Sequence, residues 1–238
     1  ENYAFKGWNF SHIRGRWKDE VLPWGYREIL LSYLKKTDRL LDMGTGGGEF
    51  LLSLNHPYNL TSVTEAYPPN VELCRNILEP VGIKVAQVFD DARLPFEKET
   101  FDIVINRHKS YDTSEVYRIL KSGAYFITQQ VGGENDNDLS YRLIYNFVPQ
   151  FPDNNLRNNV SLLKNAGFKI IESKESFTPV RFYDVGALVY FAKIIEWEFP
   201  DFSVDTCFDS LCECQRELEK TGYIEGTEHR YMLVAKKL

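Results

Sequence analysis

The sequence predicts an α/β fold in which a mostly parallel sheet of seven strands carries helices on both faces. Along most of the 238 residues, short apolar runs alternate with stretches that have helical spacing. This alternation is typical of right-handed βαβ crossovers, which build parallel sheets. In addition, one apolar run passes through a glycine-rich turn directly into a helix. These observations predict the class of the fold and leave the strand order open.

The individual elements follow from the spacing of apolar residues. The clearest helix has Tyr26, Ile29, Leu30, Tyr33 and Leu34 on one face. Further helices are expected from Glu49 onward and over residues 71–78, 113–120, 139–147 and 156–166. Strands are expected over residues 39–43, 60–65, 84–89, 101–106, 124–131, 169–177 and 231–237.

The same patterning divides the chain into parts. Residues 1–25 show no clear period and are expected to form an irregular N-terminal arm. Residues 26–177 together with 231–238 form the expected α/β domain. Residues 178–230 are too many for a loop without structure of its own, and they contain two helical patterns. We expect them to form a helical insertion that packs on the α/β domain as a substrate cap.

Composition and charge argue against several classes of function. The net charge is −6, and no block of five or six basic residues occurs, which argues against tight binding to nucleic acid. No apolar run approaches the roughly 20 residues that cross a bilayer, and no charged and then apolar leader opens the chain. Four cysteines do not look like a disulfide framework. The expected location is the cytoplasm.

The strongest motif runs from Leu40 to Phe50 and reads LLDMGTGGGEF. A buried strand enters a turn with four glycines, and a helix begins directly afterwards. Glycine permits a positive φ and lets a ligand approach the bare backbone. A tight turn without a ligand would not need so many glycines, so the segment predicts a binding site.

The spacing of this motif indicates the ligand. It reads D-x-G-x-G-x-G through Asp42, Gly44, Gly46 and Gly48, whereas the dinucleotide fingerprint would need glycine in place of Glu49. The segment resembles the first motif of class I S-adenosylmethionine-dependent methyltransferases. The resemblance implies that the turn holds the methionine portion of the cofactor and that the acid lies near its amino group and sulfonium.

Later segments extend the resemblance. Glu65 ends the second strand, where an acid can accept both ribose hydroxyls, as it also does in dinucleotide enzymes. Asp91 lies in FDDARLPF, which resembles the segment of the family that faces the adenine amino group. Residues 101–105 and 118–126 resemble the fourth strand, the next helix and the fifth strand, with Ser122 where proline is common.

The resemblance covers roughly residues 25–177 and the final strand, and it implies a Rossmann-like domain that binds S-adenosylmethionine. The reaction it implies is transfer of a methyl group, here to an acceptor that we expect to be a small molecule. The cofactor contacts it implies are Asp42, Gly44, Thr45, Gly46, Gly48, Glu65, Ala66, Asp91, Ala92 and Asn106.

Residues that could act on the acceptor follow the fourth and fifth strands, because ligands bind at the carboxyl ends of parallel strands. His108 is the candidate general base, since its ordinary pKa of about 6.5 suits proton removal near neutrality. The alternative is an exposed loop histidine or a helix cap. Arg107 could hold a substrate carboxylate or make a structural salt bridge. Tyr111, Gln129 and Gln130 could line the pocket or have core or surface roles.

Aromatic side chains crowd the N-terminal arm and the insertion. In one interpretation they form a lid that excludes water, with Trp8 against a partly apolar acceptor, and in the other they pack the arm onto the core. The arm contributes Tyr3, Phe5, Trp8, Phe10, Trp17 and Trp24, and the insertion contributes Phe182, Tyr183 and Trp197, with Arg181 beside them.

No metal site is expected, because Cys207, Cys212 and Cys214 lack the paired spacing of zinc sites. An RNA methyltransferase is the first alternative function and would need a basic rim and a recognition module. A cofactor-binding protein without catalysis is the second alternative. A nicotinamide-dependent dehydrogenase is disfavoured by Glu49 and by the spacing from Asp42. The oligomeric state and the methylated atom stay open.

Overall fold

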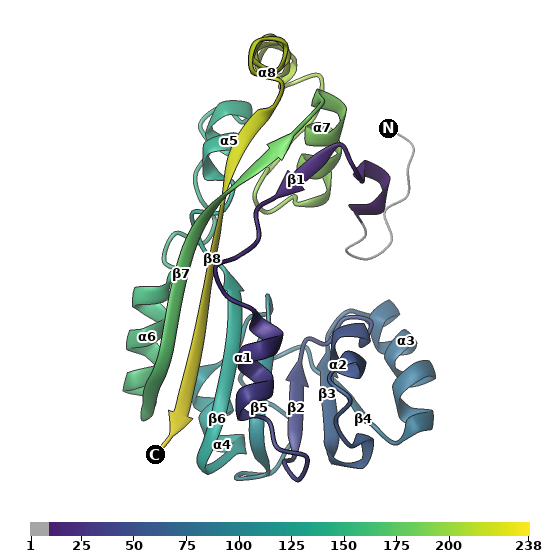
Figure 1. Ribbon diagram of the computed structural model, residues 1–238, viewed down its shortest axis with the longest axis vertical. Coiled ribbons are helices and arrows are strands. Elements are labelled where there is room, and N and C mark those ends of the chain that lie inside the picture. Colours follow the sequence, from purple (N-terminus) through teal and green to yellow (C-terminus); the bar gives the residue numbers. More distant parts are fainter. Residues whose placement is uncertain (1–9) are drawn as a thin grey trace. The chain divides into compact units, whose positions relative to one another are not determined.

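The computed structural model describes residues 10–238 as an α/β protein with an eight-stranded sheet (Figure 1). The strand order is β1-β7-β8-β6-β5-β2-β3-β4. The predicted class, a mostly parallel sheet flanked by helices, is confirmed. The number of strands differs by one. The additional strand is β1 (Trp17–Asp19), which pairs antiparallel with the end of β7 (Phe168–Phe182).

The chain forms two compact units. The core unit comprises Trp24–Val131, Asn155–Glu175 and Tyr231–Leu238. Within the described residues, the accessory unit comprises residues 10–23, Gly132–Asn154 and Ser176–Arg230. The long strands β7 (Phe168–Phe182) and β8 (Ile224–Lys237) contribute residues to both units.

Five parallel strands form the centre of the core unit: β2 (Leu40–Met43), β3 (Thr61–Glu65), β4 (Lys84–Gln87), β5 (Phe101–Arg107) and β6 (Leu120–Val131). Strand β2 lies between β3 and β5, with Asp42 opposite both Val63 and Ile105. The chain therefore continues from β2 to one side through β3 and β4, and then returns to the other side with β5 and β6. The order in which the chain adds strands therefore reverses at β2. Parallel sheets bind ligands at the carboxyl ends of the strands beside such a point of reversal.

Helices connect these strands. Pro68 occupies the first position of α3, where its missing N–H costs nothing. Asp112 caps α4 by accepting a hydrogen bond from the Glu115 N–H, and Asn155 caps α6 in the same manner through the Asn158 N–H. The helices of the core unit are α1 (Tyr26–Tyr33), α2 (Glu49–Ser53), η2 (Tyr58–Leu60), α3 (Pro68–Leu78), η3 (Glu79–Val81), α4 (Thr113–Ile119) and α6 (Leu156–Asn165).

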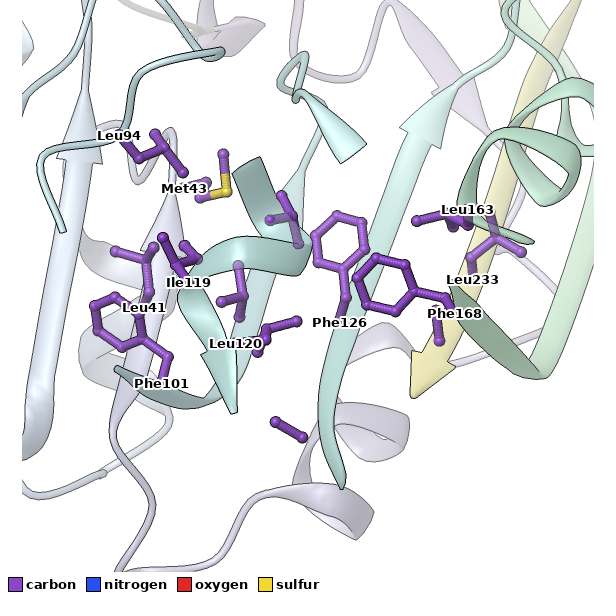
Figure 2. Close-up of a cluster of buried hydrophobic side chains, with 14 of the residues drawn as sticks. Leu41, Met43, Leu94, Phe101, Ile119, Leu120, Phe126, Leu163, Phe168 and Leu233 are labelled. Carbon is purple, nitrogen blue, oxygen red and sulfur yellow. The ribbon is translucent and has the colours of Figure 1, made fainter. Parts of the chain in front are cut away.

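Buried apolar side chains hold the core unit together. Figure 2 shows Leu41 and Met43 of β2 in the same cluster as Phe126 of β6 and Leu233 of β8. The rings of Phe96 and Phe101 meet edge to face, with their centroids 5.0 Å apart. This packing fixes the strand ends that carry the site.

The accessory unit has a hydrophobic core of its own, in which the rings of Trp17, Phe182 and Phe191 pack together. Asp184 caps α7 and also pairs with Arg16, which lowers the pKa of its carboxyl. The helices of this unit are η1 (Phe10–Ile13), α5 (Asn137–Leu143), α7 (Val185–Ile194) and α8 (Phe208–Thr221).

The structural units differ from the predicted parts in three places. Residues 132–154 were assigned to the α/β domain by sequence but belong to the accessory unit. Trp24 was assigned to the arm but belongs to the core unit. Strands β7 and β8 are longer than predicted, because Pro179 and Gly226 interrupt the sequence signal without ending the strands. Tyr3, Phe5 and Trp8 lie outside the described residues.

Within residues 10–238, no helix combines the length and apolarity that crossing a membrane would require.

Candidate functional site

The glycine turn after β2 lies at the point where the strand order of the sheet reverses. The Gly44 and Thr45 N–H groups both donate to the Thr64 carbonyl at the end of β3, at 2.9 and 3.1 Å. These two bonds tie the turn to the neighbouring strand. Helix α2 begins directly after Gly48, which has a φ of 84°.

Two of the glycines are required by close neighbours as well as by backbone conformation. Gly44 has a φ of 70°, and a Cβ at this position would lie 2.7 Å from the Lys109 side chain. A Cβ on Gly48 would lie 3.1 Å from the methyl groups of Leu78. The stem of Lys109, which follows β5, therefore packs directly on the bare backbone of the turn.

Asp42 places a carboxylate beneath this turn. Its side chain is buried, with 6% of the residue exposed. Burial raises its pKa to about 6, and the Thr45 hydroxyl and the Arg107 guanidinium offset only part of this effect. No ion pair engages Asp42 among residues 10–238. A buried carboxylate without a cation is costly unless a ligand supplies the cation.

Glu65, the last residue of β3, is also buried and faces the same turn. Its Oε2 accepts a hydrogen bond from the Gly46 N–H at 2.8 Å. Its Oε1 accepts from the Ala66 and Tyr67 N–H groups at 2.8 and 3.0 Å. The Cys74 thiol donates to the Gly46 carbonyl at 3.0 Å. The three backbone bonds fix the Glu65 carboxylate beside the glycine turn.

Asp91 lies in the segment between β4 and β5. Its Oδ2 accepts hydrogen bonds from Lys109 Nζ at 2.6 Å and from Ser110 Oγ at 2.7 Å. The same segment is anchored to α4, because Arg118 donates to the Phe96 carbonyl at 2.8 Å. Lys109 thus links the predicted adenine-facing acid to the loop after β5.

A buried amide network lies at the ends of β5 and β6. Gln130 Nε2 donates to Asn106 Oδ1 at 2.6 Å and to Thr128 Oγ1 at 2.7 Å. The Tyr26 hydroxyl lies 3.2 Å from both the backbone carbonyl oxygen of Asn106 and that of Ile127. Asn106 is fully buried, and its Nδ2 has no hydrogen-bond acceptor within residues 10–238. This donor is satisfied only if a ligand or a water molecule accepts from it.

The loop after β5 carries the candidate base. His108 is exposed, and its Nε2 lies 3.2 Å from Gln129 Nε2. Gln129 Oε1 in turn accepts a hydrogen bond from Trp24 Nε1 at 2.9 Å. The Arg107 guanidinium lies 4.3 Å from the centre of the Phe50 ring, which is a cation–π contact.

The structure brings most of the predicted cofactor residues to one edge of the sheet, in the glycine turn and at the ends of β3 and β5. Ala92 is exposed, and its N–H donates to Asp90 Oδ1 at 3.0 Å. Tyr111 lies apart from the others. It packs edge to face on Phe126, and its hydroxyl donates to Asn159 Oδ1 at 3.1 Å. The predicted contact Trp8 lies outside the described residues.

Three contributors were missed or misplaced by sequence reasoning. Lys109 and Tyr26 carry no motif, so only their contacts reveal them. Trp24 was grouped with the aromatic arm, although its indole reaches Gln129. Between residues 10 and 238, no group of three or more potential metal ligands gathers. Cys207 and Cys214 are buried, and Cys212 is partly buried.

The comparison with protein families finds one match. Residues 41–128 match the family described as "Methyltransferase domain". This span contains the glycine turn, Glu65, Asp91 and Asn106. The resemblance to class I methyltransferases is therefore confirmed over this part of the chain. No curated protein sequence matches the chain.

Solved structures share the fold at low sequence identity. A candidate methyltransferase from Bacillus halodurans is 17% identical, with a TM-score of 0.58 over 89% of this chain and 98% of that one. Geranyl diphosphate methyltransferase in complex with S-adenosylmethionine is 13% identical, with a TM-score of 0.51 over 89% and 84%. The [4+2]-cyclase SpnF is 16% identical, with a TM-score of 0.52 over 89% and 80%. At these identities the likeness shows a common fold.

Proposed function

We propose that this chain, whose residues 41–128 match the methyltransferase-domain family, is an S-adenosylmethionine-dependent methyltransferase that acts on a small acceptor. One observation carries the proposal. The Asp42 carboxylate is buried beside the glycine turn, and within the described residues it has no ion-pair partner. A ligand that brings positive charge to this position would compensate it, and S-adenosylmethionine has both an ammonium and a sulfonium.

The surrounding residues fit the remaining parts of this cofactor. Glu65 presents a fixed carboxylate that can accept hydrogen bonds from ribose hydroxyls. Asp91, held by Lys109 and Ser110, can accept from the adenine amino group. Asn106 Nδ2 is a buried donor that lacks an acceptor within the described chain. We assign Gly44, Thr45, Gly46, Gly48, Ala66 and Ala92 to the backbone and rim contacts of the same ligand.

When bound, S-adenosylmethionine supplies a methyl group that is already activated on a sulfonium centre. The protein must then hold the acceptor in line, exclude water and, for some acceptors, remove a proton. His108 is the candidate base, and Arg107 and Gln129 lie beside it on the ends of β5 and β6. The net charge of −6 favours a small acceptor over RNA.

Two titrations test the cofactor assignment. Calorimetry with S-adenosylmethionine and S-adenosylhomocysteine should show saturable binding with one site per chain, and NAD should not bind. Binding of NAD in preference to both would overturn the assignment and favour a dehydrogenase.

Methyl transfer is tested with a labelled methyl donor and three acceptor panels of small amines, small hydroxy compounds and total RNA. Label should enter a small acceptor and should be lost with His108→Asn if His108 is the base. Asparagine is chosen because the His108 backbone has a φ of 60°, a conformation that asparagine tolerates. Transfer to RNA alone would contradict the proposed acceptor class, and binding without transfer to any panel would favour a cofactor-binding protein without catalysis.

A further inference from the structure

Three side chains form a continuous hydrogen-bonded chain at the ends of β5 and β6. Trp24 Nε1 lies 2.9 Å from Gln129 Oε1, and Gln129 Nε2 lies 3.2 Å from His108 Nε2. Trp24 and Gln129 are buried, with 9% and 7% of each residue exposed. His108, the last of these three side chains, is exposed.

The chemistry of Trp24 fixes the direction of every bond in this chain. An indole nitrogen donates a hydrogen bond and cannot accept one. The Gln129 atom that faces Trp24 must therefore be the oxygen, and the amide nitrogen must face His108. An amide nitrogen is also only a donor. His108 Nε2 must then be the acceptor, so it carries a lone pair and no hydrogen.

The backbone holds His108 against Gln129 as well. The His108 N–H donates to the Gln129 carbonyl oxygen at 2.8 Å, which continues the parallel pairing of β5 with β6. His108 has a φ of 60°, which is uncommon for a residue other than glycine. Backbone strain of this kind persists where the surroundings over-determine the conformation. Here the backbone bond and the side-chain bond engage the same partner.

We propose that Trp24 and Gln129 are positioning residues that hold His108 as the neutral tautomer with its hydrogen on Nδ1 and its Nε2 lone pair covered by the Gln129 amide. In this state His108 can take a proton at Nε2 only after the Gln129 amide has been displaced. An acceptor that competes for Gln129 would thus expose the base at the moment it binds. The role in catalysis rests on the proposed function, whereas the tautomer does not.

Nuclear magnetic resonance measures the tautomer directly. Long-range ¹H–¹⁵N correlation spectra distinguish the two neutral tautomers of a histidine and the imidazolium. The chain has four histidines, and His108→Asn identifies which signals belong to His108. The expected result for the unmodified chain above pH 7 is a protonated Nδ1 and an unprotonated Nε2. A hydrogen on His108 Nε2 in this spectrum would overturn the proposal.

Two variants test whether Trp24 and Gln129 set this state. Gln129→Glu replaces the donor with a carboxylate of nearly the same shape, so the hydrogen of His108 should move to Nε2. Trp24→Phe removes the donor that orients the amide, so the His108 signals should report a mixture of tautomers. Trp17→Phe is the matched control, because Trp17 packs in the accessory unit, and it should leave the His108 signals unchanged.

Each outcome separates this proposal from the proposed function. A His108 spectrum that is unchanged in Gln129→Glu would refute the positioning role even if the chain binds S-adenosylmethionine. If Trp24→Phe does not fold, the unmodified chain and Gln129→Glu still decide the question. The expected spectra together with a failure to bind S-adenosylmethionine would refute the proposed function and leave the tautomer established.

Discussion

The two halves of the candidate site differ in chemistry. The acidic half, formed by Asp42, Glu65 and Asp91, lies around the glycine turn and presents carboxylates. The amide half, formed by Trp24, Asn106, His108, Gln129 and Gln130, lies at the ends of β5 and β6 and presents directional hydrogen bonds between neutral groups. Carboxylates suit a ligand that has cationic groups and hydroxyls. Amides and an imidazole suit the positioning of a second molecule.

The halves also differ in how their polar groups are satisfied. Glu65 and Asp91 accept several hydrogen bonds within the core unit, while Asp42 has no ion pair among the described residues. In the amide half, Gln129 is hydrogen-bonded through both its amide oxygen and its amide nitrogen, and Gln130 Nε2 donates to Asn106 Oδ1 and Thr128 Oγ1. Asn106 Nδ2 lacks an acceptor within residues 10–238. Each half therefore has at least one buried polar group that a bound ligand would satisfy.

The largest expected effect comes from removing the charge of the acidic half. Asp42→Asn should weaken binding of S-adenosylmethionine by about 100-fold or more, because loss of one partner of a buried ion pair costs about 3 kcal/mol or more. Calorimetry at pH 8 measures the change. Asp102→Asn is the matched control, since Asp102 pairs with Lys121 away from the turn, and it should leave the affinity unchanged. Equal affinity of Asp42→Asn and the unmodified chain would show that Asp42 does not pair with a cationic group of the ligand.

A smaller effect is expected from filling the space above the glycine turn. Gly44→Ala should destabilise the fold by about 2 to 3 kcal/mol, because a left-handed alanine costs about 1 kcal/mol and the new methyl group overlaps Lys109. Urea unfolding measures the free energy of unfolding of this variant, of its control and of the unmodified chain. Gly82→Ala is the control, because Gly82 also has a positive φ of 98° but no atom near its Cβ position, so it should lose only about 1 kcal/mol. Equal losses in both variants would show that Lys109 does not pack on the turn.

The smallest effect sharpens the boundary of the amide half. Tyr111 lies in the same loop as His108, yet its hydroxyl donates a hydrogen bond to Asn159 and its ring packs on Phe126 in the core. Tyr111→Phe should lower the free energy of unfolding by about 1 kcal/mol, the usual contribution of one hydrogen bond, and should not change cofactor binding. Thermal unfolding and calorimetry check both parts. A large loss of methyl transfer with intact stability would return Tyr111 to the substrate site.

The acidic half could be predicted from the sequence because its residues follow a local motif. The spacing of Asp42 and the glycines is set within one turn, and Glu65 is identified by its place at a strand end. The amide half depends on contacts between distant segments, since Trp24 and Gln129 are 105 positions apart. Residue types suggested His108 and Gln129, but no local pattern could indicate that Trp24 orients them.

The fold shows the same limit. Strands β2 to β6 were predicted within a few residues because buried apolar runs mark them. Strand β1 has three residues and no alternation, and it forms through pairing with Val180, Arg181 and Phe182 far along the chain. Residues 132–154 carry no signal that separates them from the α/β domain, so their membership of the accessory unit is visible only from their packing.

The protonation of Asp42 should make both the stability of the fold and the affinity for a cationic ligand depend on pH. Burial raises the pKa of Asp42 from its ordinary value of 3.8 to about 6. Because the folded chain holds this proton more tightly than the unfolded chain, stability should fall as the pH rises from about 4 to about 6, by up to about 3 kcal/mol. Affinity for a cationic ligand has the opposite sign, since it needs the ionised carboxylate.

The most direct test of the central claim is therefore the affinity for S-adenosylmethionine measured between pH 5 and pH 8. Binding should be constant above about pH 6.5 and should weaken roughly tenfold per pH unit below about pH 6, and Asp42→Asn should abolish this dependence. An affinity that does not change across this range, or no binding by a folded chain at any pH, would contradict the claim that Asp42 receives the positive charge of the cofactor.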